Sequence, residues 1–106
     1  MITWITGQSK SGKSTLARKI SDKAVILDGN KLRQVWTDLG LSKEDRWEQN
    51  LRAARLAKMI DEQGIDVIVA TICPYKELRE EVRKITGCKF IYLEDGIESS
   101  DYPYEI

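Results

Sequence analysis

The residues with the clearest chemistry form a glycine-rich loop near the amino end of the chain. Residues 7–14, GQSKSGKS, fit the pattern G-x-x-x-x-G-K-[ST], and the apolar run 2–5 comes directly before them. In such a loop, successive backbone N–H groups point inward at a polyphosphate, while Lys13 reaches the outer phosphates and Ser14 can ligate Mg²⁺. A helix beginning at Ser14 would direct its positive end at the same phosphates. The expected ligands are a nucleoside triphosphate such as ATP and Mg²⁺.

A chance occurrence of this loop is improbable. With Gly at about 7% of average composition, two fixed glycines followed by Lys and Ser or Thr arise in well under about 1% of chains this short. The surrounding strand and helix that the motif needs are also indicated by the sequence. The residues expected to contact the nucleotide are Gly7, Gln8, Ser9, Lys10, Ser11, Gly12, Lys13, Ser14 and Thr15.

Length and composition indicate one small domain over residues 1–106, because no linker-like segment divides the chain. The 17 basic and 17 acidic residues balance, which argues against nucleic acid or an anionic membrane as a partner. With no leader pattern and no long apolar stretch, we expect a cytoplasmic protein. Two cysteines and no histidine make a zinc site improbable, so free thiols are expected.

Apolar runs and helical patterns alternate along the chain. Strands are expected at residues 2–5, 24–27, 65–72 and 89–93, and helices at 14–20, 30–38, after the N-cap Ser42 up to Gly64, and from Pro74 up to Gly87. The long helix should carry a broad apolar stripe of Trp47, Leu51, Ala54, Leu56, Met59 and Ile60. This order predicts an α/β, three-layer P-loop NTPase-type fold with a mostly parallel sheet of about four strands and helices on both faces. The nearly continuous apolar run 65–72 should lie centrally. Residues 94–106 are expected to be an irregular tail.

The order of motifs resembles the adenylylsulfate kinase family, P-loop enzymes that move the γ-phosphate of ATP to the 3′-hydroxyl of adenosine 5′-phosphosulfate. Residues 28–33, DGNKLR, are similar to the family's D-G-D-x-x-R, and residues 38–46, DLGLSKEDR, to D-L-G-F-S-x-x-D-R. Residues 67–75, VIVATICPY, are similar to V-I-x-A-x-I-S-P-Y. Together these segments are far more specific than the loop alone.

The resemblance implies roles for residues at the carboxyl ends of the strands. Lys13 and Asp28 would act in catalysis, with Ser14 and Asp28 holding the metal. Asp28 has an equally weighted alternative as a helix N-cap together with Asn30. The residues implied for the acceptor are Asp28, Asn30, Arg33, Leu41, Arg46, Gln49, Asn50, Ile72, Cys73 and Pro74.

Arginine is the side chain best suited to clamp an anionic acceptor, because its planar guanidinium binds phosphate or sulfate oxygens in pairs. From the sequence alone, however, an arginine on an amphipathic helix is more often solvated or weakly paired. Arg33 and Arg46 are the best candidates for binding the acceptor, and Arg52 and Arg79 are weaker ones. Trp36 and Trp47 could stack on a base, with core packing as the favoured alternative.

The chain departs from the family pattern at several positions. This chain has Lys10 where the family has glycine, Asn30 where it has aspartate and Leu41 where it has an adenine-stacking phenylalanine. It has Cys73 where the family commonly has serine. If the long helix aligns without a gap, Gln49 takes the place of the family's substrate-binding asparagine, with Asn50 beside it. Asp101 to Glu105, similar to D-x-P-Y-E, follows the last strand almost at once, with no counterpart of the family's mobile basic lid. Because a lid excludes water, transfer could be slow or partly uncoupled unless a second subunit in a homodimer covers the site.

The leading hypothesis is therefore a kinase that moves phosphate from Mg·ATP to a hydroxyl of a small anionic acceptor, with adenosine 5′-phosphosulfate as first candidate. One alternative is a nucleotide-binding module with little catalysis. The other is a P-loop kinase for a different hydroxyl, on a sugar, a nucleoside or a polynucleotide 5′ end, which Leu41 would favour.

Overall fold

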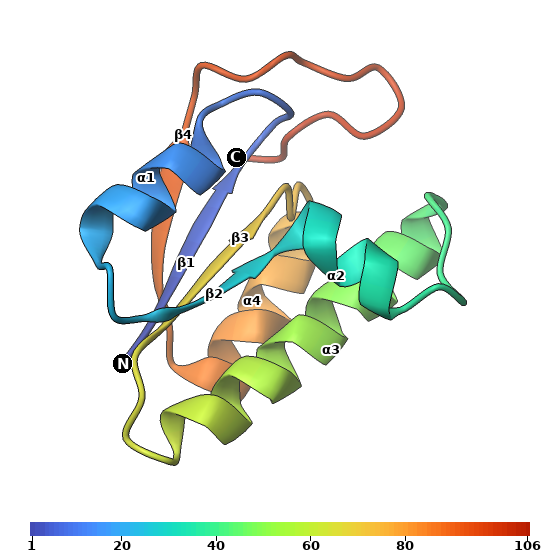
Figure 1. The fold of residues 1–106 in the computed structure, drawn as a ribbon. Coiled ribbons are helices and arrows are strands. Elements are labelled where there is room, and N and C mark those ends of the chain that lie inside the picture. Colours follow the sequence, from blue (N-terminus) through green and yellow to red (C-terminus); the bar gives the residue numbers. More distant parts are fainter.

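The computed structural model describes residues 1–106 and has the alternation of strands and helices that the sequence predicts (Figure 1). In chain order the elements are β1 (Ile2–Gly7), α1 (Lys13–Ile20), β2 (Val25–Asp28), α2 (Gly29–Val35), α3 (Lys43–Asp61), β3 (Val67–Thr71), α4 (Lys76–Thr86) and β4 (Lys89–Leu93). No helix reaches the length and apolar character that a membrane span needs.

The four strands form one sheet in the order β2-β3-β1-β4, and every pairing is parallel. All five residues of β3 are buried, as the apolar run 65–72 predicts for a central strand. The helix α1 covers one face of the sheet, while α2, α3 and α4 cover the other (Figure 1). The expected three-layer α/β fold is confirmed.

The two faces have separate cores because successive side chains of a strand point to opposite sides. Ile5 and Ile68 pack with Ala17 beneath α1. Trp4, on the other face of β1, belongs to a larger cluster that includes Ala54 of α3 and other buried residues of α3 and α4. Each strand therefore contributes to both layers while its carboxyl end stays at one edge of the sheet.

Helix boundaries follow local signals in part. The Ser42 hydroxyl accepts a hydrogen bond from the Asp45 N–H at 3.1 Å, which confirms the predicted N-cap of α3. Gly87 ends α4 in the left-handed conformation, with φ of 64°. Contrary to the prediction, Pro74 does not begin α4. Tyr75 is still extended and is the N-cap of this helix.

The predicted end of α2 and part of the predicted face of α3 are wrong. The helix α2 stops at Val35, because Trp36 leaves the helical conformation while its N–H still bonds to the Leu32 carbonyl. Met59, expected on the apolar stripe of α3, is 53% exposed. The other residues of the predicted stripe do face the core, since Ala54 is buried and Trp47, Leu51, Leu56 and Ile60 pack against it while partly buried. The fully buried side chains of α3 are small or polar: Gln49, Asn50, Ala53, Ala54 and Ala57.

The tail 94–106 has no helix or strand, as predicted, but it is docked against the glycine-rich loop and the start of α4 (Figure 1). The Ile97 N–H donates to the Ser9 carbonyl at 2.7 Å, and the Glu105 N–H donates to the Pro74 carbonyl at 2.8 Å. Arg79 donates to the Glu105 carbonyl. The tail therefore spans the edge of the sheet where the strands end.

Candidate active site

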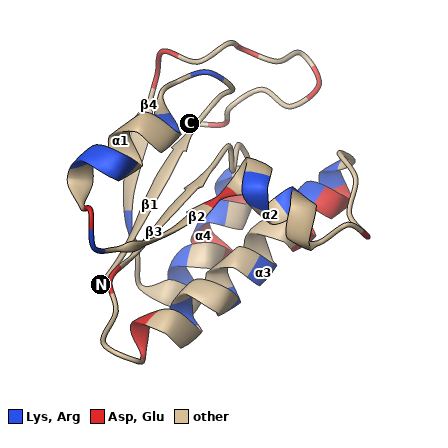
Figure 2. Cartoon of the chain, in the orientation of Figure 1, with Lys and Arg blue, Asp and Glu red and all other residues tan.

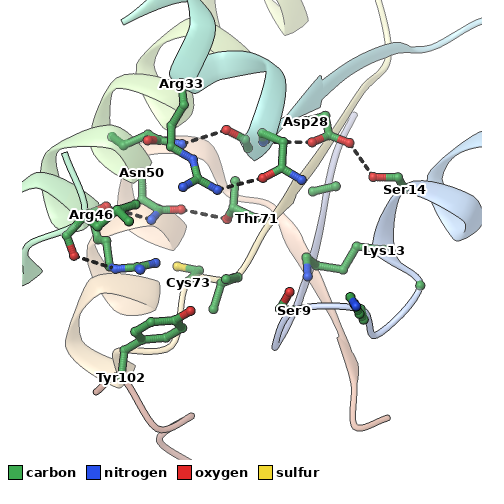
Figure 3. Close-up of a pocket in the computed structure, with 18 of the residues that line it drawn as sticks. Ser9, Lys13, Ser14, Asp28, Arg33, Arg46, Asn50, Thr71, Cys73 and Tyr102 are labelled. Atoms are coloured by element: carbon green, nitrogen blue, oxygen red, sulfur yellow. Dashed lines mark hydrogen bonds between the residues drawn. The ribbon is translucent and has the colours of Figure 1, made fainter. Parts of the chain in front are cut away.

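A cavity of about 510 Å³ lies at the carboxyl ends of the strands, where the sequence places the ligand site (Figure 3). The sequence-predicted residues that line it are Ser9, Lys10, Gly12, Lys13, Ser14, Thr15, Asp28, Asn30, Arg33, Leu41, Arg46, Gln49, Asn50, Ile72 and Cys73. Four predicted residues do not line it: Gly7, Gln8, Ser11 and Pro74. Gly7, Gln8 and Pro74 support the cavity from within the fold, since each is buried.

The glycine-rich loop has the backbone conformations that its glycines allow. Gly7 has a φ of 153° and Gly12 a φ of 95°. A Cβ atom on Gly7 would lie 2.5 Å from the Leu93 carbonyl oxygen, so no larger residue fits without a shift of the backbone. The tight turn from β1 into α1 thus depends on this glycine.

The Lys13 ammonium is folded back into the loop that precedes it. Its Nζ donates to the carbonyl oxygens of Gly7 and Gln8, both at 2.9 Å. Burial lowers the pKa of Lys13, and the nearby Asp28 carboxylate partly opposes this effect. A desolvated ammonium inside a ring of main-chain groups is well suited to a multiply charged anion.

Ser14 and Asp28 are in direct contact across the cavity floor. The Ser14 hydroxyl donates to Asp28 Oδ2, while Asp28 Oδ1 accepts from the Asn30 N–H at 2.9 Å. The second bond confirms the N-cap interpretation of Asp28. The two side chains also bring together oxygen ligands of the type that hard divalent cations prefer. No group of three or more His, Cys, Asp or Glu residues is present, so these oxygens would form only part of a metal shell.

Positive charge is concentrated around the cavity although the whole chain is neutral. Basic and acidic residues are spread over the elements of the fold (Figure 2). Lys10, Lys13, Arg33 and Arg46 line the cavity against one acidic side chain, Asp28. Neither arginine forms an ion pair, because the five ion pairs of the chain involve other residues. Two unneutralised guanidinium groups facing a phosphate-binding loop indicate a second anionic ligand.

The inner wall of the cavity is a chain of polar hydrogen bonds. Trp4 Nε1 donates to Thr71 Oγ1 at 2.9 Å, and Thr71 Oγ1 donates to Asn50 Oδ1 at 2.7 Å. Gln49 Nε2 donates to the Gly29 carbonyl at 3.1 Å. Gln49 and Asn50 both line the site, and both also join α3 to the carboxyl ends of the strands.

Cys73 lines the cavity as a neutral thiol. Its side chain is buried, and this burial raises its pKa to about 12. Both cysteines are free. A thiol that stays protonated is a poor nucleophile, so Cys73 shapes the wall rather than reacting.

Four weaker candidates lie outside the cavity. Arg79 donates to the Cys73 carbonyl at 2.9 Å and to the Glu105 carbonyl of the tail. Arg52 forms an ion pair with Asp38. Trp36 packs beside the core and under the Arg52 guanidinium. Trp47 stacks on Tyr75 with ring centroids 5.6 Å apart. None of these side chains lines the cavity.

The sequence analysis missed four residues that line the cavity, Gly29, Ala70, Thr71 and Tyr102. Thr71 ends the central strand β3, so its place at the carboxyl edge could have identified it. Tyr102 belongs to the segment similar to D-x-P-Y-E, but no local pattern indicates that the tail returns to the cavity.

Comparison with known proteins decides the family. Residues 1–98 match the family description Adenylylsulphate kinase. The adenylyl-sulfate kinase of Geotalea daltonii is 41% identical over an alignment of 93 residues, and the match covers 80% of this chain and 46% of that protein. The chain belongs to the adenylylsulphate kinase family. The resemblance of the motifs is thereby confirmed.

Solved structures of family members have the same fold. Mycobacterium tuberculosis APS kinase CysC in complex with AMPPNP and APS superimposes with a TM-score of 0.76 at 36% identity, covering 86% of this chain and 59% of that one. A hexameric APS kinase from Thiobacillus denitrificans gives 0.77 at 29% identity, covering 99% of this chain and 23% of that one. The chain spans about half the length of the curated relatives it matches.

Proposed function

We propose that this chain binds ATP with Mg²⁺ and transfers the γ-phosphate to the 3′-hydroxyl of adenosine 5′-phosphosulfate. The observation that carries the proposal is one cavity with an intact phosphate-binding loop on one side and two unpaired arginines on the other. A relative of known structure was solved with AMPPNP and APS together, which supports both ligands.

On the donor side, the loop amides and Lys13 would hold the β- and γ-phosphates. The Ser14 hydroxyl and the Asp28 carboxylate would hold Mg²⁺, directly or through water. The bound metal ion would supply positive charge that offsets the charge of the phosphates. Lys13 would exchange its bonds to the loop carbonyls for bonds to phosphate oxygens.

On the acceptor side, Arg33 and Arg46 would bind the phosphate and sulfate oxygens. The acceptor hydroxyl oxygen then forms a bond to the γ-phosphorus while the bond from that phosphorus to the ADP oxygen breaks. The hydroxyl proton leaves to a base. Asp28 is the single acidic side chain of the cavity and so the candidate for this base, apart from water.

Transfer is expected to be partly uncoupled from ATP consumption. The segment from Leu93 to Asp101 contains no Lys or Arg, so it supplies no cation to the transferred phosphate. Water that reaches the γ-phosphate would compete with the acceptor. A second copy of the chain could cover the cavity, and a homodimer stays a prediction.

A coupled assay that counts ADP and phosphorylated acceptor separately tests the proposal. We expect acceptor-dependent ADP release with adenosine 5′-phosphosulfate, a smaller amount of 3′-phosphorylated product, and neither with Lys13→Ala. ADP release that no acceptor stimulates would favour a nucleotide-binding module with little catalysis. Strict equality of ADP and product in a monomer would contradict the uncoupling.

One observation favours a second candidate, a kinase for another hydroxyl. Leu41 lines the cavity and is 58% exposed, so an aliphatic surface stands where the family pattern has an aromatic one. Aliphatic contact discriminates weakly between bases and sugars, whereas stacking favours bases. The same assay with a panel of sugars and nucleosides distinguishes this candidate, since only the preferred acceptor raises ADP release.

A further inference from the structure

Tyr102 is the aromatic side chain of the cavity wall, and it comes from the docked tail rather than from the sheet or helices (Figure 3). The Arg46 guanidinium lies over its ring, with the central guanidinium carbon 3.8 Å from the ring centroid. This is the shortest of the six cation–π contacts in the chain.

The arginine is fixed at two points along its side chain. Arg46 Nε donates to the Leu41 carbonyl at 2.9 Å, and the guanidinium face rests on Tyr102. A guanidinium has five N–H donors, so this arrangement leaves the four on its terminal nitrogens free. In Figure 3 these nitrogens point into the cavity, toward Cys73.

An aromatic ring is the kind of support that leaves the arginine able to bind an anion. A carboxylate partner would neutralise the guanidinium and compete with an incoming phosphate or sulfate group. A ring face holds the cation through its quadrupole and carries no net charge. Arg46 has no ion pair, so Tyr102 restricts its motion without masking its charge.

The main chain of Tyr102 is itself bound to the phosphate-binding loop. Gln8 Nε2 donates to the Tyr102 carbonyl at 2.9 Å, and the Tyr102 N–H donates to Ser99 Oγ at 3.3 Å. Gln8 is 3% exposed and is part of the phosphate-binding loop. These bonds use the main chain of Tyr102, so they survive a change of its side chain.

We propose that Tyr102 is a positioning residue that holds Arg46 in place for the anionic acceptor. The backbone of Tyr102 is in turn fixed to the phosphate-binding loop through Gln8. The inference rests on the proposed function, because it takes Arg46 as the acceptor clamp. Tyr102 acts through Arg46 and through its ring face. The Tyr102 hydroxyl makes no hydrogen bond, so phenylalanine at this position should support Arg46 equally well.

Titration of adenosine 5′-phosphosulfate into the chain saturated with Mg·ADP tests this role. Tyr102→Leu is expected to weaken acceptor binding by about three- to thirtyfold, the range of one cation–π contact, while ADP affinity stays unchanged. Tyr102→Phe should bind as the unaltered chain does. In the Arg46→Gln background, Tyr102→Leu should have no further effect.

Tyr92→Leu is the matched control, because Tyr92 stacks on Tyr104 of the same tail with centroids 4.1 Å apart but does not line the cavity. An equal loss in Tyr92→Leu, or an undiminished effect of Tyr102→Leu in the Arg46→Gln background, would overturn the positioning role. Unchanged acceptor affinity in Tyr102→Leu would overturn it as well. No binding by the unaltered chain would instead overturn the proposed acceptor, and the inference with it.

Discussion

Lys10 occupies a backbone conformation that glycine adopts more easily. Its φ is 62°, in the left-handed region, where a Cβ atom costs about 1–2 kcal/mol. This gives a physical reason for the glycine that the family pattern has at this position. The loop therefore carries strain that comes from one side chain and can be removed.

Lys10→Gly is expected to raise the free energy of unfolding by about 0.5–1 kcal/mol, because relief of the left-handed strain exceeds the extra chain entropy that glycine loses on folding. Urea denaturation monitored by tryptophan fluorescence measures this. Lys10→Ala, which keeps the Cβ atom, serves as the control and should change stability by less than about 0.5 kcal/mol. Equal stabilisation by both changes would show that strain is not the cause.

The two buried thiols should resist alkylation in the folded chain. Burial raises the pKa of Cys73 from 9.0 to about 12 and also raises that of Cys88. Because the reactive thiolate forms only as pH approaches the folded-state pKa, iodoacetamide at pH near 8 should modify neither residue within the time that labels a free thiol. Mass spectrometry counts the labels, and both cysteines should react in guanidinium. Rapid labelling of Cys73 in the folded chain would contradict its assigned burial.

At the scale of elements, the sequence predicts those features whose causes are local. The Ser42 cap and the Gly87 stop act within one turn, and the apolar run of β3 requires burial whatever its neighbours are. The exposure of Met59 could not be predicted, because the side of α3 that packs on the sheet depends on contacts with distant strands, such as the hydrogen bond between Thr71 and Asn50. The docking of the tail likewise depends on contacts between residues far apart in sequence, such as those with Gln8, Ser9 and Pro74.

Gly96→Ala is expected to detach the tail from the glycine-rich loop. A Cβ atom on Gly96 would lie 2.7 Å from Gln8 backbone atoms, which cannot move without disturbing the loop. Hydrogen exchange of residues 94–106 should become faster, and the free energy of unfolding should fall by about 1–3 kcal/mol.

Gly40→Ala is the matched control for this change. Its added Cβ would meet only the Asp45 carboxylate, at 3.3 Å, and Gly40 has no positive φ. Exchange of the tail should be unaffected by it. Unchanged tail exchange in Gly96→Ala would show that this close approach does not hold the tail in place.

At the scale of the whole molecule, the candidate site combines a local motif with contacts between distant segments. The loop that contains Lys13 and Ser14 is recognisable in the sequence because it is continuous. Tyr102 reaches the cavity because the tail is docked there, in part through Gln8, which is 94 residues away in sequence and binds the Tyr102 carbonyl. Such a contact follows from the path of the folded tail and not from any spacing of residue types, so sequence analysis alone did not find it.

The same scale explains how a chain with balanced charge can bind anions. Elsewhere acidic side chains pair with a few basic groups: Asp38 and Glu48 with Arg52, and Glu80 with Arg83. Around the cavity they do not, so Arg33 and Arg46 keep their charge available (Figure 3). Anion binding at this site therefore depends on the scarcity of acidic side chains around the cavity, and not on an excess of basic residues over the whole chain.

Calorimetric titration of Mg·ATP into the folded chain tests the central claim most directly, namely that the loop before α1 holds the terminal phosphates of a nucleotide. We predict one site of micromolar affinity, weakened about 10- to 150-fold by Lys13→Ala through loss of charge-assisted bonds and weakened again when EDTA removes the metal. No heat of binding under conditions that detect micromolar complexes, or equal affinity in Lys13→Ala, would contradict this claim.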